Sequence, residues 1–165
     1  MKPVEETPTE PVDYAVLSAT YGALLTTLAY ASRRREASLE PITPTELAPL
    51  GLATFALSKT LVHEKVETWL RAPFVEEHRG EKRPRGRGLR YAVGELFTCT
   101  RCMGTWSALG LVALRLGRPA AGRSVITVLA AAGANDFLQA EFSRACARAK
   151  QADVDTPERR SPRAA

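Results

Sequence analysis

The sequence predicts an all-α, membrane-embedded bundle of about four helices with disordered termini, and three observations support this fold class. Apolar residues gather into long uncharged blocks, Lys and Arg crowd into a few loops between these blocks, and both ends of the chain are polar and contain proline. The mean hydropathy of −0.16 conceals this segregation, because the charged loops offset the apolar blocks in the average. With 165 residues, the chain is long enough for one domain with a hydrophobic core.

The first apolar block predicts a helix over residues 13–32. Residues 14–32 carry no charge, and a stretch of about 20 such residues is long enough to cross a bilayer. A central helix of a soluble bundle is the alternative interpretation, although such a helix normally carries a polar stripe. Residues 1–12 are acidic and rich in proline, which predicts a disordered tail and is the reverse of a secretory signal peptide.

The second apolar block predicts one long helix over residues 47–70. Its first half is uncharged, whereas its second half carries several charged side chains. Lys59, His63 and Glu67 are spaced by four residues and therefore share one helix face. We expect a helix that begins in lipid and ends at the interface, where long charged side chains reach water.

A strongly basic segment follows at residues 71–91. Its glycines and prolines predict a loop rather than a stable helix. We expect a solvated cytoplasmic loop, with contact to anionic lipid or to nucleic acid as the alternatives. Aromatic side chains are not interleaved with its basic residues, which argues against nucleic acid as a partner.

Two more apolar blocks predict helices over residues 95–116 and 123–148. The first of them opens with a Cys-x-x-Cys pair, Cys99 and Cys102, and carries Trp106 one turn further on. Its uncharged run is shorter than a full membrane span, so a tilted or re-entrant helix is an open alternative. The polar and basic residues 149–165 predict a second disordered tail.

The distribution of positive charge predicts how the bundle is oriented. Four spans place the two termini and the basic segment on one side, and this side carries more Lys and Arg than the other. The positive-inside rule then predicts a multi-pass protein of the cell membrane with cytoplasmic N- and C-termini. Because the cytosol keeps thiols reduced, the three cysteines are expected to be free or metal-bound.

Two stretches of the chain resemble a known family. The first is residues 52–74, an apolar run that continues through Lys59 and Glu64 to Arg71. The second reads Gly-Glu-Leu-x-x-Cys-x-x-Cys-x-x-x-Trp and leads into an apolar helix. The residues that carry the resemblance, and that we take as candidate functional residues, are Lys59, Glu64, Arg71, Glu95, Cys99, Cys102 and Trp106. They resemble the domain-of-unknown-function 1360 family, small bacterial proteins that include a sporulation-associated protein of Bacillus, over residues 47–142. The resemblance implies an integral membrane protein and supplies no activity.

Three interpretations of the cysteine pair stay open. A structural zinc site needs four ligands, and Cys99, Cys102 and His63 supply three, which a second copy of the chain could complete. A thiol-redox centre is the second interpretation, because the helix dipole and Arg101 favour the thiolate of Cys99. Packing of two small apolar side chains at a helix junction is the third.

The sequence contains no Ser/His/Asp triad, no phosphate-binding loop and no paired catalytic carboxylates in a supporting context, so an enzyme is not the first interpretation. We expect a small integral membrane protein with an accessory or protein-interaction role, whose partners are the lipid bilayer and either another copy or another membrane protein. The alternatives are a membrane-bound thiol-redox or zinc-binding protein and a soluble helical module that binds nucleic acid.

Overall fold

The computed structural model describes residues 7–34, 40–78 and 81–155. These residues form six α-helices, one short 3-10 helix and one β-hairpin. In chain order the elements are α1 (Pro11–Arg34), η2 (Pro44–Glu46), α2 (Leu47–His63), α3 (Thr68–Arg71), β1 (Val75–His78), β2 (Glu81–Pro84), α4 (Leu89–Thr98), α5 (Thr100–Gly117) and α6 (Pro119–Asp155).

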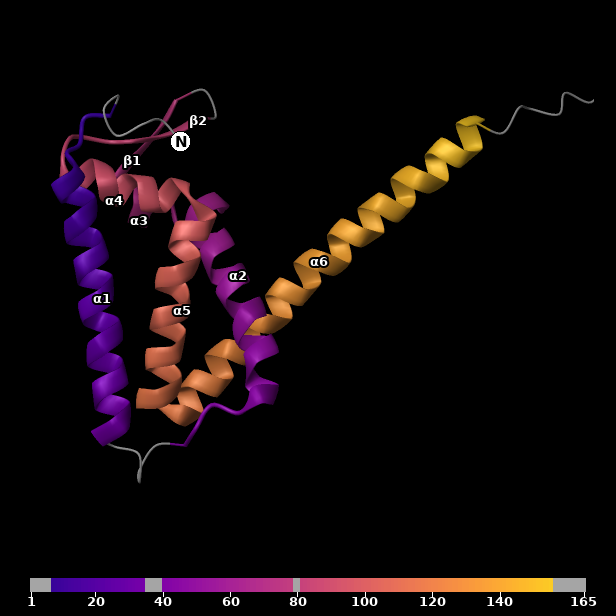
Figure 1. Ribbon diagram of the computed structural model, residues 1–165. Coiled ribbons are helices and arrows are strands. Elements are labelled where there is room, and N and C mark those ends of the chain that lie inside the picture. The colour runs from indigo at the N-terminus through magenta and orange to yellow at the C-terminus, as the bar shows by residue number, and fades with distance from the viewer. Residues whose placement is uncertain (1–6, 35–39, 79–80, 156–165) are drawn as a thin grey trace, which may run out of the picture.

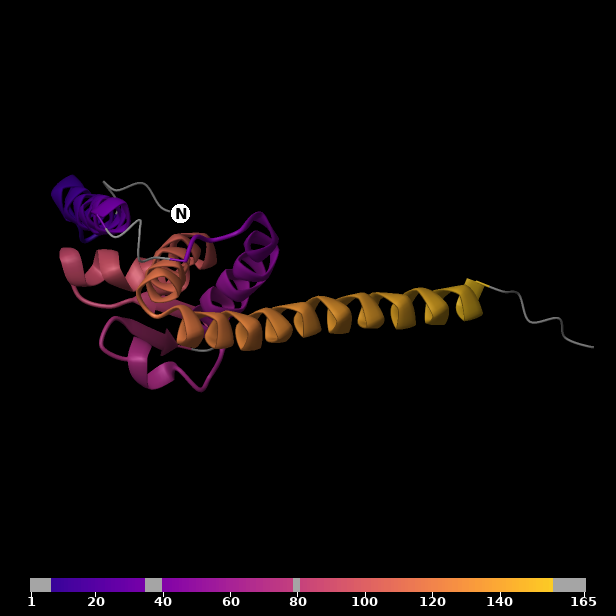
Figure 2. The ribbon, with the colours of Figure 1, turned by 90° about the horizontal axis from the view of Figure 1, so that it is seen from below.

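Helices α1, α2 and α5 run along one another, and α4 lies across one end of them (Figure 1). Helix α6 starts at the opposite end, packs against α2 and α5, and then extends well beyond the body of the molecule, as Figures 1 and 2 both show. The core lies where α2, α5 and α6 meet and is built from Ala53, Leu111, Ile126 and Ala130. At Gly133 a Cβ atom would lie only 2.6 Å from the Leu52 carbonyl oxygen, so α6 and α2 are in backbone contact there.

Helix α1 matches the helix predicted over residues 13–32, and it lies on the outside of the molecule with no buried residue. Among the described helices, α1 alone is long and apolar enough to cross a membrane by length and composition. The structure therefore supports a mostly helical fold.

The helix predicted over residues 47–70 is broken, and this part of the prediction is wrong. Helix α2 ends at His63, and the short α3 follows after a turn. The Arg71 guanidinium donates hydrogen bonds of 2.8 Å to the carbonyl oxygens of Leu61 and Glu64. Lys82 donates one of 2.6 Å to the Val62 carbonyl oxygen. These two cations satisfy the last carbonyl groups of α2, which is what a helix end requires.

The basic segment is not the unstructured loop that the sequence predicts. Strands β1 and β2 pair antiparallel, with Val75 opposite Pro84, so the fold is not purely α-helical. The hairpin packs on α4, where a Cβ on Gly94 would lie 3.1 Å from Pro84 Cα, and the rings of Phe74 and Phe97 stack at 5.8 Å. Gly88 adopts a φ of 60° at the start of α4, a conformation that favours glycine.

Two further boundaries differ from the prediction. The helix expected over residues 95–116 is two helices, α4 and α5, which meet at Cys99 in an extended conformation. Helix α6 continues to Asp155, so residues 149–155 are helical rather than part of a disordered tail. The predicted tail residues 1–6 and 156–165 lie outside the described residues, and Pro11 already belongs to α1.

Candidate functional site

The cysteine pair lies at the junction of α4 and α5. Cys99 is the N-cap residue of α5, with a φ of −117° and a ψ of 104°, and its sulfur accepts a hydrogen bond from the Cys102 backbone N–H at 3.3 Å. The Cys102 thiol donates to the same sulfur, and the two Sγ atoms lie 2.7 Å apart. Both thiols are free and half-buried. The break between the two helices therefore brings both sulfurs together at a helix N-terminus.

This position changes the acidity of Cys99. Burial alone raises the pKa of the Cys99 thiol, but hydrogen bonds from the Cys102 thiol and from the backbone N–H groups of Cys102 and Arg101 outweigh it. The charge of Arg101 acts in the same direction, so the pKa of Cys99 lies below its ordinary value. A lowered pKa increases the thiolate fraction near neutral pH, and the thiolate is the nucleophilic form of cysteine.

Both cysteines line a cavity of about 320 Å³ between α1, α4 and α5. Its apolar wall includes Leu17, Ala92 and Leu96, and its polar groups besides the thiols include Tyr14 and Glu95. Apolar pockets with a few convergent polar groups are the usual form of a binding or active site.

Glu95 lies in this cavity and is held from across the molecule. The Tyr14 hydroxyl donates a hydrogen bond of 2.5 Å to Glu95 Oε2 and accepts one of 3.2 Å from the Thr9 hydroxyl. The Thr9 and Thr7 hydroxyls are themselves 2.7 Å apart. A chain of hydroxyl groups thus leads from the carboxylate to the N-terminal end of α1. The sequence identified Glu95 as a candidate residue, but it did not mark Tyr14 as the partner of Glu95.

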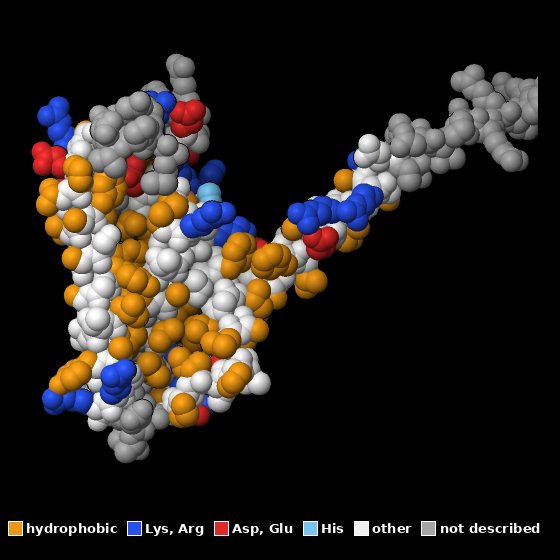
Figure 3. Space-filling model, in the orientation of Figure 1, with side chains coloured by type: hydrophobic (Ala, Val, Ile, Leu, Met, Phe, Trp, Pro, Cys, Tyr) orange, Lys and Arg blue, Asp and Glu red, His pale blue; other side chains and the backbone are white. Residues whose placement is uncertain are grey.

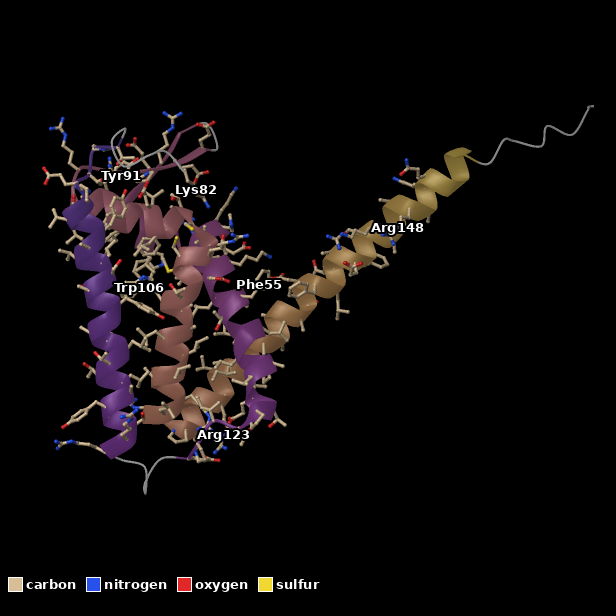
Figure 4. All side chains as sticks on the ribbon, in the orientation of Figure 1. Phe55, Lys82, Tyr91, Trp106, Arg123 and Arg148 are labelled. Atoms are coloured by element: carbon tan, nitrogen blue, oxygen red, sulfur yellow. The ribbon has the colours of Figure 1, made fainter. Side chains whose placement is uncertain are left out.

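Trp106 helps to hold α1 against α5. Its ring meets that of Tyr21 edge to face, with centroids 5.4 Å apart and an interplanar angle of 69°. Figure 4 shows Trp106 between these two helices. The Trp106–Tyr21 contact and the Tyr14–Glu95 hydrogen bond therefore hold α1 against α5 and α4, the helices that enclose the cavity.

His63 does not join the cysteine pair in a ligand set. Its Nε2 atom lies 3.1 Å from the Thr100 hydroxyl, which places α2 beside the start of α5. Within residues 7–34, 40–78 and 81–155, no three His, Cys, Asp or Glu side chains gather as a metal site would require. Zinc binding by Cys99 and Cys102 with ligands from a second copy stays a prediction.

The three candidate residues from residues 52–74 are Lys59, Glu64 and Arg71, and they take part in contacts that stabilise the fold. Lys59 pairs with Asp136 of α6 at 2.9 Å and, more loosely, with Glu64 at 3.9 Å. Arg71 is buried and caps α2, as described above. These contacts join α2 to α6 and to α3, and none of the three residues lines the thiol cavity.

A second polar cluster, at the opposite end of the molecule, was missed by the sequence analysis. Arg115 of α5 is only 1% exposed and binds Glu46 through Nε at 2.8 Å and through Nη2 at 3.2 Å. Beside it, Arg123 binds both carboxylate oxygens of Glu40, and Figure 4 shows Arg123 at this end. The available signal was an arginine that follows a long uncharged run in an apolar helix, because such a charge needs a partner when it is buried.

Together, the fold and the site define a small helical protein with a close pair of thiols facing a cavity. The chain belongs to the family described as protein of unknown function (DUF1360), whose profile matches residues 49–142. It is 31% identical over 104 residues to the sporulation protein YjcA of Bacillus subtilis (strain 168), an alignment that covers 58% of this chain and 88% of that protein. No solved structure matches the chain. The predicted resemblance is therefore confirmed, and the matched residues include Glu95 and both cysteines but not Tyr14.

Proposed function

We propose that this protein is a multi-pass membrane protein whose Cys99–Cys102 pair carries out thiol–disulfide exchange at the membrane edge. The observation that carries the proposal is the 2.7 Å approach of the two sulfurs at the start of α5, beside a cavity that both line. Vicinal thiols in this arrangement can pass two electrons to a disulfide and close a disulfide of their own.

The membrane part of the proposal is supported by the dimensions of the helices and by the surface. At 1.5 Å per residue, the 24, 17 and 18 residues of α1, α2 and α5 give lengths of about 36, 26 and 27 Å. These lengths are close to the hydrocarbon thickness of a bilayer, about 30 Å. Figure 3 shows hydrophobic side chains along the middle of the body, with Lys and Arg side chains at its two ends.

The orientation follows from the same charges. The start of α1, the hairpin and the far end of α6 all lie toward one end of the molecule (Figure 1). This end includes the basic hairpin region and the exposed Arg144, Arg148 and Lys150 of α6. The positive-inside rule therefore favours cytoplasmic termini, with the cysteine pair at the cytoplasmic edge, where thiols are kept reduced. We propose that α1, α2, α5 and the first part of α6 are the spanning helices.

The proposed exchange has two steps. The Cys99 thiolate attacks one sulfur of a substrate disulfide, which forms a mixed disulfide and releases the first substrate thiolate. The Cys102 thiol then loses its proton and attacks the Cys99 sulfur, which closes the Cys99–Cys102 disulfide and releases the second substrate thiolate. The substrate gains two electrons and the cysteine pair loses two, so the protein acts as a reductant until its own thiols are restored.

The test uses the full chain in detergent with Cys146→Ala, which removes the exposed third thiol. Mixing the reduced protein with the chromogenic disulfide dithiobis(nitrobenzoic acid) should release a first nitrobenzoate thiolate quickly and a second one as the internal disulfide closes. Cys102→Ser should abolish the second release and trap the mixed disulfide. Cys99→Ser should slow the first release about tenfold or more, because Cys102 lacks the capping position. Equal rates in the parent and in Cys99→Ser would contradict the proposal.

A second candidate function is the accessory role that the sequence predicts. The far part of α6 exposes Leu138 and Phe142, at 70% and 72%, to the surroundings. Exposed apolar side chains on a helix that leaves the body of the molecule favour contact with a second copy or another membrane protein. The absence of a second release of nitrobenzoate thiolate in the experiment above would favour this accessory role.

A further inference from the structure

The thiol cavity is connected by hydroxyl groups to a second, more open hollow. Thr7 and Thr9 line a groove of about 660 Å³ with the exposed Glu10 and Arg87. From this groove, the hydroxyls of Thr9 and Tyr14 form a hydrogen-bonded path to Glu95 Oε2. The backbone N–H of Gly88 donates to the Pro8 carbonyl oxygen at 2.9 Å, which fixes the N-terminal segment beside the start of α4.

Glu95 is the carboxylate that lines the cavity together with the cysteines. It stands four residues before Cys99, in the last turns of α4, so it shares a helix face with the point where the chain turns into α5. Its side chain is half-buried, and a carboxylate in such a place can accept a proton from a group that must ionise during a reaction.

We infer that Glu95 is the proton acceptor for Cys102, and that Tyr14 and Thr9 carry the proton from Glu95 to solvent at the N-terminal end. The inference rests on the thiol-exchange function proposed above and assigns the residue that its second step needs. Before the step, Glu95 is ionised and accepts the hydrogen bond of Tyr14. During it, the Cys102 proton moves to the Glu95 carboxylate, the Cys102 sulfur bonds to the Cys99 sulfur, and the bond from Cys99 to the substrate sulfur breaks.

The proton then leaves along the hydroxyl path. A hydroxyl group is both a donor and an acceptor and can rotate, so Tyr14 donates to Glu95 in one state and to Thr9 in the other. The protonated Glu95 gives its proton to the Tyr14 oxygen, the Tyr14 proton passes to the Thr9 oxygen, and the Thr9 proton passes to water in the groove, so that Glu95 is again ionised and each hydroxyl is again neutral. The net result is one proton moved from Cys102 to the groove that Thr7 and Thr9 line.

The same contact between Tyr14 and Glu95 also joins α1 to α4, so a purely structural role predicts a different result. A structural clamp, when loosened, changes the whole cavity and affects both steps of the exchange. A proton acceptor for Cys102 acts chiefly on the second step, because the lowered pKa of Cys99 already favours its thiolate before the first step.

The experiment measures the two releases of nitrobenzoate thiolate separately, by rapid mixing across a range of pH, in full-length protein carrying Cys146→Ala. Glu95→Gln keeps the shape of the side chain and should slow the second release about a hundredfold while leaving the first within about twofold. Tyr14→Phe should slow the second release less, because Glu95 remains and loses only its path to solvent. Glu77→Gln, which removes an equal charge from the exposed hairpin, is the matched control and should change neither.

The outcomes separate the inference from the function on which it rests. A parent protein without a second release, or with one that survives Cys102→Ser, contradicts the exchange function itself. A parent with a normal second release that Glu95→Gln leaves unchanged contradicts the inference alone. Equal slowing of both releases in Glu95→Gln and Tyr14→Phe assigns the pair a structural role and likewise overturns the inference.

Discussion

At the scale of single residues, the ion pair between Glu46 and Arg115 is a contact that was not predicted from the sequence. The two residues are far apart in the chain, and the Arg115 side chain is 2% exposed where it meets the Glu46 carboxylate. Hydrogen bonds from Arg115, together with those from Thr43, lower the pKa of Glu46 to about 2 from an ordinary value of 4.5. If Glu46 were neutral, the buried charge of Arg115 would lose its main partner.

This ion pair predicts a stability that depends on pH. Because the pKa of Glu46 is lower in the folded protein, its contribution is fully present above pH 4.5 and is lost as the pH falls toward about 2. We expect Glu46→Gln to lower the melting temperature at neutral pH and to flatten its fall over that acidic range, as measured by circular dichroism in detergent. Glu81→Gln, in an exposed ion pair with Arg83, is the control and should behave like the parent. A parent-like acid profile in Glu46→Gln would contradict the assignment.

The candidate residues of the thiol site were predictable only in part. A stretch of eight residues contains Glu95, Cys99 and Cys102, and a helical conformation of this stretch would bring their side chains near one another. Tyr14 is 81 residues from Glu95, and nothing in an apolar helix marks one tyrosine as the partner of a distant carboxylate. Lys59, another candidate residue, forms its close ion pair with Asp136 and not with Glu95.

At the scale of elements, the end of α2 could not be predicted from the local sequence. Residues 59–71 contain neither glycine nor proline, so no local signal ends a helix there. The signal is supplied by Arg71 and Lys82, which reach back to the last carbonyl groups of α2. Burial and the nearby charge of Arg71 lower the pKa of Lys82, which is the cost of placing two cations at one helix end.

The contact between α2 and α6 predicts an unequal response of two helical glycines to the same substitution. Gly133→Ala places a methyl group 2.6 Å from the Leu52 carbonyl oxygen, so the helices must separate, at a cost of about 1–3 kcal/mol. Gly110→Ala in α5 meets no atom within 4 Å and should be neutral or stabilise the protein by up to about 1 kcal/mol. Denaturant or thermal unfolding in detergent measures both, and equal effects of the two substitutions would contradict the close packing.

At the scale of the whole molecule, composition predicted the helical class but not its full extent. The helical residues 149–155 begin with Ala149, Lys150, Gln151 and Ala152, which are strong helix formers, and this propensity outweighs the polar character that suggested a tail. The β-hairpin was not predicted, because the charged Lys82 and Arg83 were interpreted as loop residues, whereas they stand at strand positions that pair with the adjacent strand β1.

The proposed topology makes a prediction about the two ends of the molecule. In a cysteine-free background, Glu77→Cys places a thiol on the hairpin, and Thr45→Cys places one at the opposite end, in η2; both positions are exposed. The positive-inside rule puts the hairpin in the cytoplasm. In intact cells a membrane-impermeant maleimide should therefore label Thr45→Cys, whereas Glu77→Cys should be labelled only after permeabilisation.

The same preparation tests whether the chain is in the membrane at all. The protein should sediment with membranes, resist extraction by high salt and be released by detergent, because its apolar helices rather than its basic hairpin hold it there. Labelling of both positions only after permeabilisation, with the protein in the soluble fraction, would contradict the spanning arrangement. Labelling of Glu77→Cys alone in intact cells would keep the spans but invert them, and the thiol pair would then face an oxidising compartment, where Cys99 and Cys102 would rest as a disulfide and act as an oxidant.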